Sequence, residues 1–139
     1  VMYLSILVIT ALLALIASVG SQNTSYDTPI PCCSVPVNSV PADQRASWCV
    51  AQENSCFELC GDQGSLSSKV NVCDDTTLDF TCKCTNDTDI TSKMSEYQQN
   101  FPGLICISWF DACINASSSD AGAQFQCVQA RDNECGNKT

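Results

Sequence analysis

Cysteine is the residue that most restricts how this chain can fold. The sequence holds 12 cysteines in 139 residues, and all of them lie after residue 31. Such a density is typical of small extracellular domains held together by disulfides. The even count, the absence of histidine from the sequence and the lack of a C-x2-C pair favour six disulfides over a metal site. The cysteines are Cys32, Cys33, Cys49, Cys56, Cys60, Cys73, Cys82, Cys84, Cys106, Cys113, Cys127 and Cys135.

Three of the cysteines define a first helix. Cys49, Cys56 and Cys60 are spaced seven and then four residues apart. On an α-helix that turns by about 100° per residue, such positions fall within roughly 40° of one another. The helix is expected to begin near Pro41, which a first turn tolerates, and to end at Gly61, a favourable C-cap. One face of this helix therefore presents three thiols to its neighbours.

Strict alternation of apolar and polar residues predicts a β-strand over residues 78–85. Side chains alternate between the two faces of a strand, so every second residue is expected on the inner face. Residues 69–73 are the candidate second arm of a short hairpin. The predicted inner face consists of Leu78, Phe80, Cys82 and Cys84.

Helical periodicity returns in the C-terminal half. A short helix is expected over residues 92–99, and a third helix over residues 102–115. In the third helix the apolar residues stand at i, i+3, i+4, i+7 and i+8, which matches a core-facing stripe. These residues are Cys106, Trp109, Phe110, Cys113 and Ile114.

A fourth helix is expected after Ser117–Asp120, whose polar side chains can cap its N-terminus. Its inward positions would be Ala123, Cys127 and Ala130. The predicted fold class is therefore mainly α: a small disulfide-rich domain with about four helices and one short β-strand or hairpin, spanning residues 42–139.

The N-terminal region divides into two further segments. Residues 2–19 form an apolar-rich run followed by small residues, so residues 1–21 are predicted to be a cleaved signal peptide. The alternative is an uncleaved membrane anchor, because 18 apolar-rich positions are just long enough to span a bilayer. Either alternative places the cysteines outside the cell. After cleavage no integral membrane span is expected.

Residues 22–41 are predicted to form an extended linker arm, because their Pro, Ser and Thr content opposes regular structure. The arm carries Cys32 and Cys33. Adjacent cysteines bond to each other only with strain, so each is expected to link the arm to a different partner. Elsewhere we expect disulfides from the first helix to the strand and to the third or fourth helix.

Four N-x-S/T sequons lie in predicted linkers, loops or tails, where a glycosylating enzyme can reach them. Their number and placement favour passage through a eukaryotic secretory pathway. The candidate glycosylation sites are Asn23, Asn86, Asn115 and Asn137.

The charge of the chain disfavours two classes of partner. The formal net charge is −9 at pH 7, and the six basic residues are never adjacent. Nucleic acid and anionic lipid surfaces attract clusters of Lys and Arg, so neither is an expected partner. The acidity instead suits a protein that stays dissolved outside the cell, and we expect a monomer.

The cysteine framework resembles a family of fungal secreted domains of unknown function. The resemblance covers about residues 40–135 and implies a secreted scaffold, often attached to the cell surface through a GPI anchor. It is carried by the following motifs: Trp48-Cys49-x6-Cys56-x3-Cys60, Asn71-Val72-Cys73-Asp74, Thr76-Thr77-Leu78-x-Phe80-x-Cys82-x-Cys84, Glu96-Tyr97-Gln98-Gln99, Pro102-x2-Ile105-Cys106 and Trp109-x3-Cys113.

A second, weaker resemblance is to the fungal CFEM domain. It rests on Cys56-x3-Cys60, on Cys73 and on Asp79-x2-Cys82-x-Cys84. Some CFEM members bind haem through an aspartate placed like Asp79, so this resemblance implies a haem or small-ligand site at that residue. The strand pattern instead places Asp79 on the solvent face, opposite the cysteines. Otherwise no cofactor is expected.

Catalysis is not expected. Histidine, the commonest general base, is absent, and paired cysteines offer no thiol nucleophile. Two pairs of carboxylates are glycosidase candidates by residue type alone, Glu53 with Glu58 and Asp74 with Asp75.

Aromatic rings suggest a binding role instead. Trp48 lies about a quarter-turn from the cysteine face and is the candidate open ring for a cell-wall glycan, whereas Trp109 fits the core stripe. The sequence therefore predicts a secreted, non-enzymatic fungal protein of the cell surface or medium. It would be wall-associated or effector-like, with a cell-wall glycan or a host protein as partner. A CFEM-like module that binds haem or another small ligand is the alternative.

Overall fold

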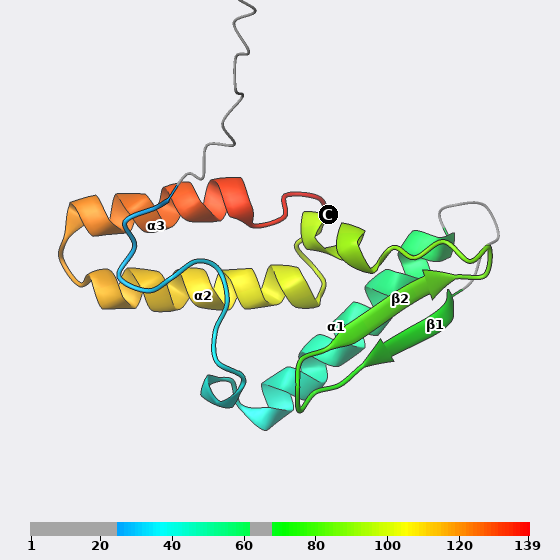
Figure 1. The fold of residues 1–139 in the computed structure, drawn as a ribbon. Helices are drawn as coiled ribbons and strands as arrows, with labels where there is room; N and C mark the ends of the chain where they lie inside the picture. The colour runs from blue at the N-terminus through cyan, green and yellow to red at the C-terminus, as the bar shows by residue number, and fades with distance from the viewer. Residues whose placement is uncertain (1–24, 62–67) are drawn as a thin grey trace, which may run out of the picture.

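The computed structural model describes residues 25–61 and 68–139 (Figure 1). The predicted signal peptide, 1–21, and the sequon at Asn23 lie outside these residues. The predicted class, a small mainly α, disulfide-rich domain with one antiparallel hairpin, is confirmed. In chain order the elements are η1 (Val37–Ser39), α1 (Ala42–Gly61), β1 (Ser68–Cys73), β2 (Phe80–Cys84), η2 (Thr91–Glu96), α2 (Phe101–Ser117) and α3 (Ala121–Glu134).

The first unit of the fold consists of α1 and the β1–β2 hairpin, which runs along it (Figure 1). Three disulfides join α1 to the hairpin. The Cα atoms in each pair lie 5.3–5.7 Å apart, within the usual range for a disulfide. The predicted common face of the three helix cysteines is confirmed. The pairs are Cys49–Cys73, Cys56–Cys82 and Cys60–Cys84.

The hairpin turn explains why β2 begins at Phe80 and not at Leu78 as predicted. The Asp74 carboxylate accepts hydrogen bonds from the backbone N–H groups of Thr76 and Thr77, at 2.8 and 3.3 Å. Leu78 has a positive φ of 67° and donates its N–H to the Asp74 carbonyl. The residue that alternation assigned to the strand therefore belongs to the turn.

The second unit is a pair of antiparallel helices, α2 and α3 (Figure 1). Asn100 caps α2 by accepting the Gly103 N–H at 3.1 Å. Asp120 caps α3, as the sequence predicted, by accepting two backbone N–H groups. Disulfides Cys113–Cys127 and Cys106–Cys135 link α2 to α3 and to the residue that follows it.

The predicted disulfide between the first helix and a later helix is wrong. The three cysteines of α1 all bond to the hairpin, and the cysteines of α2 bond within the second unit. The cause is the direction of the buried stripe on α2: Trp109 and Cys113 pack against Cys127 and Ala130 of α3. Within the described residues, which include all twelve cysteines, no disulfide joins the two units.

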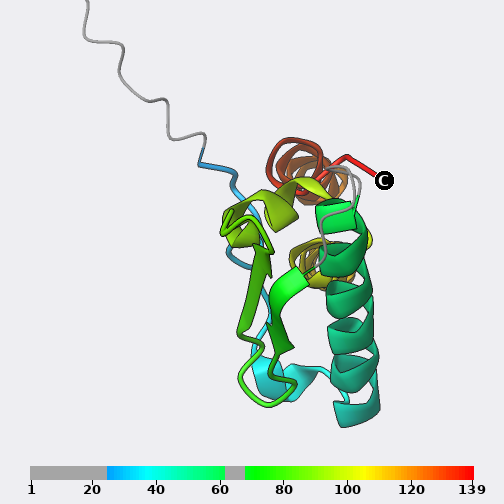
Figure 2. The ribbon, with the colours of Figure 1, turned by 90° about the vertical axis from the view of Figure 1, so that its right-hand side faces the viewer.

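Side-chain packing and hydrogen bonds hold the units together. Figure 2 shows α2 and α3 nearly end-on while α1 runs vertically, so the units cross steeply. Phe101, at the start of α2, is fully buried against Trp48 of α1 and Phe80 of β2, with ring centroids 5.9 and 6.0 Å apart. The buried Gln52 accepts the Phe101 N–H through Oε1 at 3.0 Å.

The N-terminal arm lies against the second unit. Tyr26, Ile30, Cys33 and Val35 are half-buried and pack on the cluster around Trp109. The predicted linker arm is therefore packed on α2 and α3 by apolar contacts. Within residues 25–61 and 68–139, no helix combines the length and the apolar character needed to cross a membrane.

The junction yields a first prediction. Phe101→Ala removes a fully buried ring that touches both units, so the free energy of unfolding should fall by about 3–5 kcal/mol in urea denaturation. The matched control is Phe57→Ala, because Phe57 is 58% exposed on α1 and its loss should change stability little. Equal effects of the two variants would contradict this role for Phe101.

Candidate functional site

The sequence predicts that the cysteines form disulfides and bind no metal, yet three of them cluster as metal ligands would. The sulfur atoms of Cys56, Cys60 and Cys82 lie within 4.8 Å of one another. Each of the three is bonded in a disulfide, and a metal ligand would have to be a free thiolate. Two adjacent disulfides that tie α1 to β2 therefore account for the cluster.

The prediction that Cys32 and Cys33 bond to different partners is wrong, because the structure bonds them to each other. The other ten cysteines form five pairs whose Cα atoms lie 5.3–5.9 Å apart. These five pairs leave the two arm cysteines as the remaining partners for each other.

The prediction of an open Trp48 ring is also wrong. Trp48 is 6% exposed and packs edge-on against Phe101. The quarter-turn that separates it from the cysteine face points it toward the start of α2, which covers it. Trp48 is a core residue and offers no flat ring to a glycan, whereas Trp109 is fully buried as predicted.

Asp79 lies in the turn directly before β2 and is exposed. Its backbone takes part in the turn: the N–H donates to Thr77 Oγ1 at 3.3 Å, and the carbonyl accepts the Asp74 N–H at 2.8 Å. Asp79 is therefore exposed, as the strand pattern predicted, but it lies in the hairpin turn and not in the strand. Haem binding at this residue stays a prediction, which a Soret band lost in Asp79→Ala would test.

Three sequons fall within the described residues, and all three asparagines are exposed. Asn86 lies in the loop after β2, where its side chain accepts the Thr88 N–H at 3.0 Å. Asn115 lies in the last turn of α2, because that helix continues to Ser117, and Asn137 follows α3. Exposure leaves all three open to a glycosylating enzyme.

Of the carboxylates nominated for catalysis, Glu58 lines a hollow beside α1, and the lining of that hollow holds no second carboxylate. Hydrogen bonds from the Thr76 hydroxyl and the backbone of Thr76 and Thr77 hold the pKa of Asp74 below its usual value. A glycosidase acid needs the opposite shift. Glu53 and Glu58 are exposed on α1.

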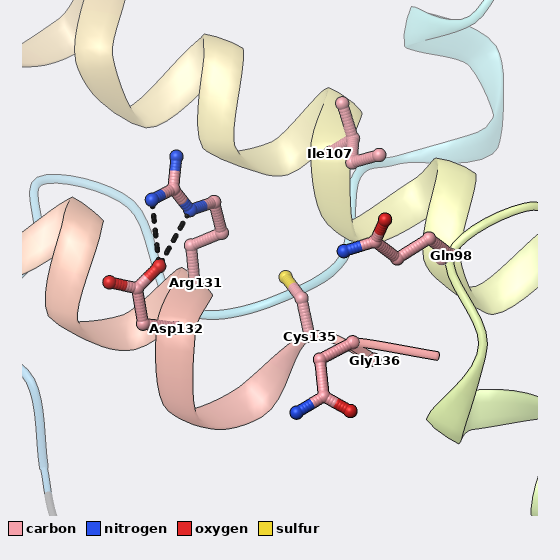
Figure 3. A pocket seen from close by; sticks show the side chains of 8 residues that line it. Gln98, Ile107, Arg131, Asp132, Cys135 and Gly136 are labelled. Carbon is pink, nitrogen blue, oxygen red and sulfur yellow. Dashed lines mark hydrogen bonds and ion pairs between the residues drawn. The ribbon is translucent and has the colours of Figure 1, made fainter. Parts of the chain in front are cut away.

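Amide and charged side chains converge on a hollow elsewhere in the fold. A pocket of about 200 Å³ lies between the start of α2 and the end of α3. Gln98, Ile107 and Asn137 line it, together with the Arg131–Asp132 ion pair (Figure 3). Figure 3 shows Gln98 and the ion pair on either side of the Cys135 side chain.

A second hollow, of about 520 Å³, lies between α1 and the start of α2. Asn54 and Glu58 of α1 line one side, and Gln99 lies near its other side. Gln98 and Ile107 line both this hollow and the smaller pocket, so the two adjoin. We call the combined surface the amide groove and define it by five residues: Asn54, Gln98, Gln99, Ile107 and Asn137.

The groove suits a ligand that carries many hydroxyl groups. Each amide side chain offers both donors and acceptors without a charge. Ile107 is 43% exposed and adds an apolar surface to the groove. Sugars present both hydroxyl groups and C–H faces, so this combination can hold them. The Gln98-Gln99 pair belongs to the motifs quoted above, but sequence reasoning missed the groove because Asn54 and Asn137 are distant in the chain.

The C-terminal segment fixes one wall of the groove. The Lys138 N–H donates to the Glu96 carbonyl, and the Gln98 N–H donates to the Lys138 carbonyl, both at 2.9 Å. The Lys138 ammonium group also pairs with the Glu96 carboxylate. These contacts, with the Cys106–Cys135 disulfide, hold Gln98 beside the end of the chain.

Comparison with known proteins places the chain in a family. Residues 33–139 match the family described as "Domain of unknown function (DUF7707)", and the chain belongs to it. No curated protein and no solved structure matched the sequence. The matched residues include both disulfide-linked units, and they begin at Cys33 of the N-terminal arm.

Close backbone packing beside the groove gives a second prediction. A Cβ atom on Gly103 would overlap the backbone carbonyls of Gln98 and Tyr97, so Gly103→Ala should lower the free energy of unfolding by about 1–3 kcal/mol. Gly122→Ala, where a Cβ finds more room, should stay within about 1 kcal/mol of the parent. Urea denaturation of both variants is the measurement, and a neutral Gly103→Ala would contradict the packing.

The Glu96–Lys138 pair gives a third prediction. The hydrogen bond from Lys138, followed by attraction to its charge, holds the pKa of Glu96 below the usual 4.5, and the same contact raises the pKa of Lys138 above 10.5. The stabilising contribution is therefore complete between pH 4.5 and 10.5. It is lost as the pH falls through the lowered pKa of Glu96, or rises through the raised pKa of Lys138.

Hydrogen exchange at the backbone N–H groups of Gln98 and Lys138 measures this contribution. Their protection factors should fall as the solution is acidified below pH 4.5. Glu96→Gln should lower protection at neutral pH and remove that acid dependence. Glu58→Gln, an exposed change on α1, should leave it intact. The same acid dependence in Glu96→Gln would show that another group controls the segment.

Proposed function

We propose that this chain is a secreted, non-enzymatic protein of a fungus that acts outside the cell and contacts cell-wall glycan through the amide groove. The observation that carries the binding role is the pair Gln98 and Ile107, which line two adjoining hollows together with other amides. A host protein is the alternative partner.

The disulfides support an extracellular location. Five of them close loops of 14–29 residues, and each should stabilise the fold by about 3–4 kcal/mol through restriction of the unfolded chain. Their loss in a reducing compartment would leave two small units held by non-covalent contacts alone. An oxidising environment is the setting in which such a chain stays folded.

The side chains in the groove support binding without catalysis. The sequence contains no histidine, and all twelve cysteines are paired. Arg131, which lines the smaller hollow, is already bonded to Asp132 through two nitrogens, at 2.9 and 2.7 Å. Two carboxylates, Glu58 and Asp132, line the hollows, and Asp132 is held in the ion pair with Arg131. Glycoside cleavage requires a cooperating pair of carboxylates, whereas the uncharged amides orient hydroxyl groups without proton transfer.

A wall-binding assay tests the proposal. The parent protein should co-sediment with isolated fungal cell walls, and Gln98→Ala combined with Asn54→Ala should lower the bound fraction at least about tenfold, because several hydrogen bonds are lost. Gln44→Ala, an exposed amide change on α1 outside the groove, is the matched control. Unchanged binding by the double variant would overturn the role of the groove.

Secretion needs its own readout. A full-length gene expressed in a fungal host should release protein into the medium or wall. Reduction should raise its intact mass by the mass of two hydrogen atoms for each of the six disulfides. Asn86→Gln and Asn115→Gln should each remove one glycan from that mass. Protein retained inside the cell with free thiols would overturn the extracellular proposal, whatever the wall-binding result.

A further inference from the structure

The larger hollow of the amide groove has one charged residue in its lining. Glu58 is that residue, and the other lining residues are amide, hydroxyl or apolar. Glu58 is exposed on α1 and stands four residues after Asn54, so the two side chains are neighbours on one face of the helix. A ligand in the hollow therefore meets a carboxylate beside an amide.

Within the described part of the chain, no basic side chain forms an ion pair with Glu58. All six basic residues of the sequence lie in that part. Four of them pair with acidic residues other than Glu58, and the remaining two, Arg45 and Lys93, form no ion pair there. The negative charge of Glu58 is therefore available to a positively charged group on a ligand.

A hydrogen bond between the two walls of the hollow holds an amide residue near this carboxylate. The Ser55 hydroxyl donates to the Gln99 carbonyl at 3.1 Å, and both residues line the hollow. Ser55 precedes Glu58 by three residues, which is about one turn of α1. The hollow therefore combines one carboxylate with amides from α1 and from the segment before α2.

We propose that the amide groove binds a glycan built of amino sugars with free amino groups, and that Glu58 selects this class. The inference rests on the glycan-binding role proposed above and names the kind of glycan. A protonated amino group donates charge-assisted hydrogen bonds to the Glu58 carboxylate, while the amides of Asn54, Gln98 and Gln99 exchange hydrogen bonds with hydroxyl groups. Neutral glycans lack the ion pair, and acidic glycans are repelled by Glu58 and by the net charge of −9.

The exposure of Glu58 sets the size of the expected effect. An ion pair in contact with water contributes modestly to affinity and is screened by salt. We therefore expect the groove to bind an amino-sugar oligomer about three- to fivefold more tightly than its N-acetylated form at low salt. Most of this preference should disappear at high salt, whereas the hydrogen bonds of the amides should remain.

Titration with two matched oligomers tests the preference. The tetramer of glucosamine carries free amino groups, and the tetramer of N-acetylglucosamine has the same backbone without their charge. NMR titration of the parent protein at mildly acidic pH, where the amino groups are protonated, measures both affinities. The glucosamine tetramer should bind more tightly at low salt. Equal affinities, or tighter binding of the N-acetylated tetramer, would overturn the inference.

Charge-matched substitutions separate Glu58 from the overall charge of the protein. Glu58→Gln and Glu53→Gln each remove one negative charge from an exposed position on α1, but only Glu58 lines the larger hollow. Glu58→Gln should abolish the preference for the glucosamine tetramer, and Glu53→Gln should keep it. The helical circular dichroism signal of both variants should equal that of the parent. Equal loss of preference in the two variants would show that net charge attracts the amino sugar and would overturn the role of Glu58.

The Gln98→Ala and Asn54→Ala double variant separates this inference from the proposed function. It should weaken both tetramers, because the amides bind the hydroxyl groups that the two tetramers share. If it does so while Glu58→Gln keeps the preference, the groove binds glycan and the amino-sugar inference is wrong. A parent protein that co-sediments with walls but binds neither tetramer would also overturn the inference, and the wall-binding assay would decide the proposed function by itself.

Discussion

The packing of Phe101 between Trp48 and Phe80 is the contact on which the arrangement of this domain depends. Three disulfides cross-link α1 to the hairpin and two link α2 to α3 and Cys135, but the described chain has none between these units. Phe101 is fully buried where the units meet, and Gln52 holds its N–H. A disulfide-rich protein thus relies on non-covalent contacts, chiefly a hydrophobic cluster centred on Phe101 and a buried hydrogen bond, to set the relation of its two halves.

The amide groove lies across the same junction. Asn54 belongs to the first unit, Ile107 and Asn137 to the second, and Gln98 to the segment that connects η2 with α2. The shape of the groove is therefore set by how the units dock and not by either unit alone. The Glu96–Lys138 contact reinforces this docking, because it ties the end of the second unit to η2.

Sequence reasoning was accurate where the signal was local. The seven-and-four spacing of cysteines identified the bonding face of α1, alternation identified β2, and Asp120 identified the start of α3. It failed where the answer depended on distant residues. Trp48 was assigned to solvent because no local pattern shows that Phe101 covers it. Leu78 was assigned to the strand because alternation does not reveal that Asp74 organises the turn.

Pairing of cysteines shows the same limit and separates two kinds of disulfide. Helical periodicity shows that three thiols share a face, but only the tertiary fold shows that the hairpin, and not α2, lies against that face. Five pairs then connect elements that are distant in the chain, which is how a disulfide stabilises a fold with a small core. Cys32 and Cys33 are neighbours in the chain, so their pairing adds no such connection, and apolar contacts hold the arm on α2 and α3 instead.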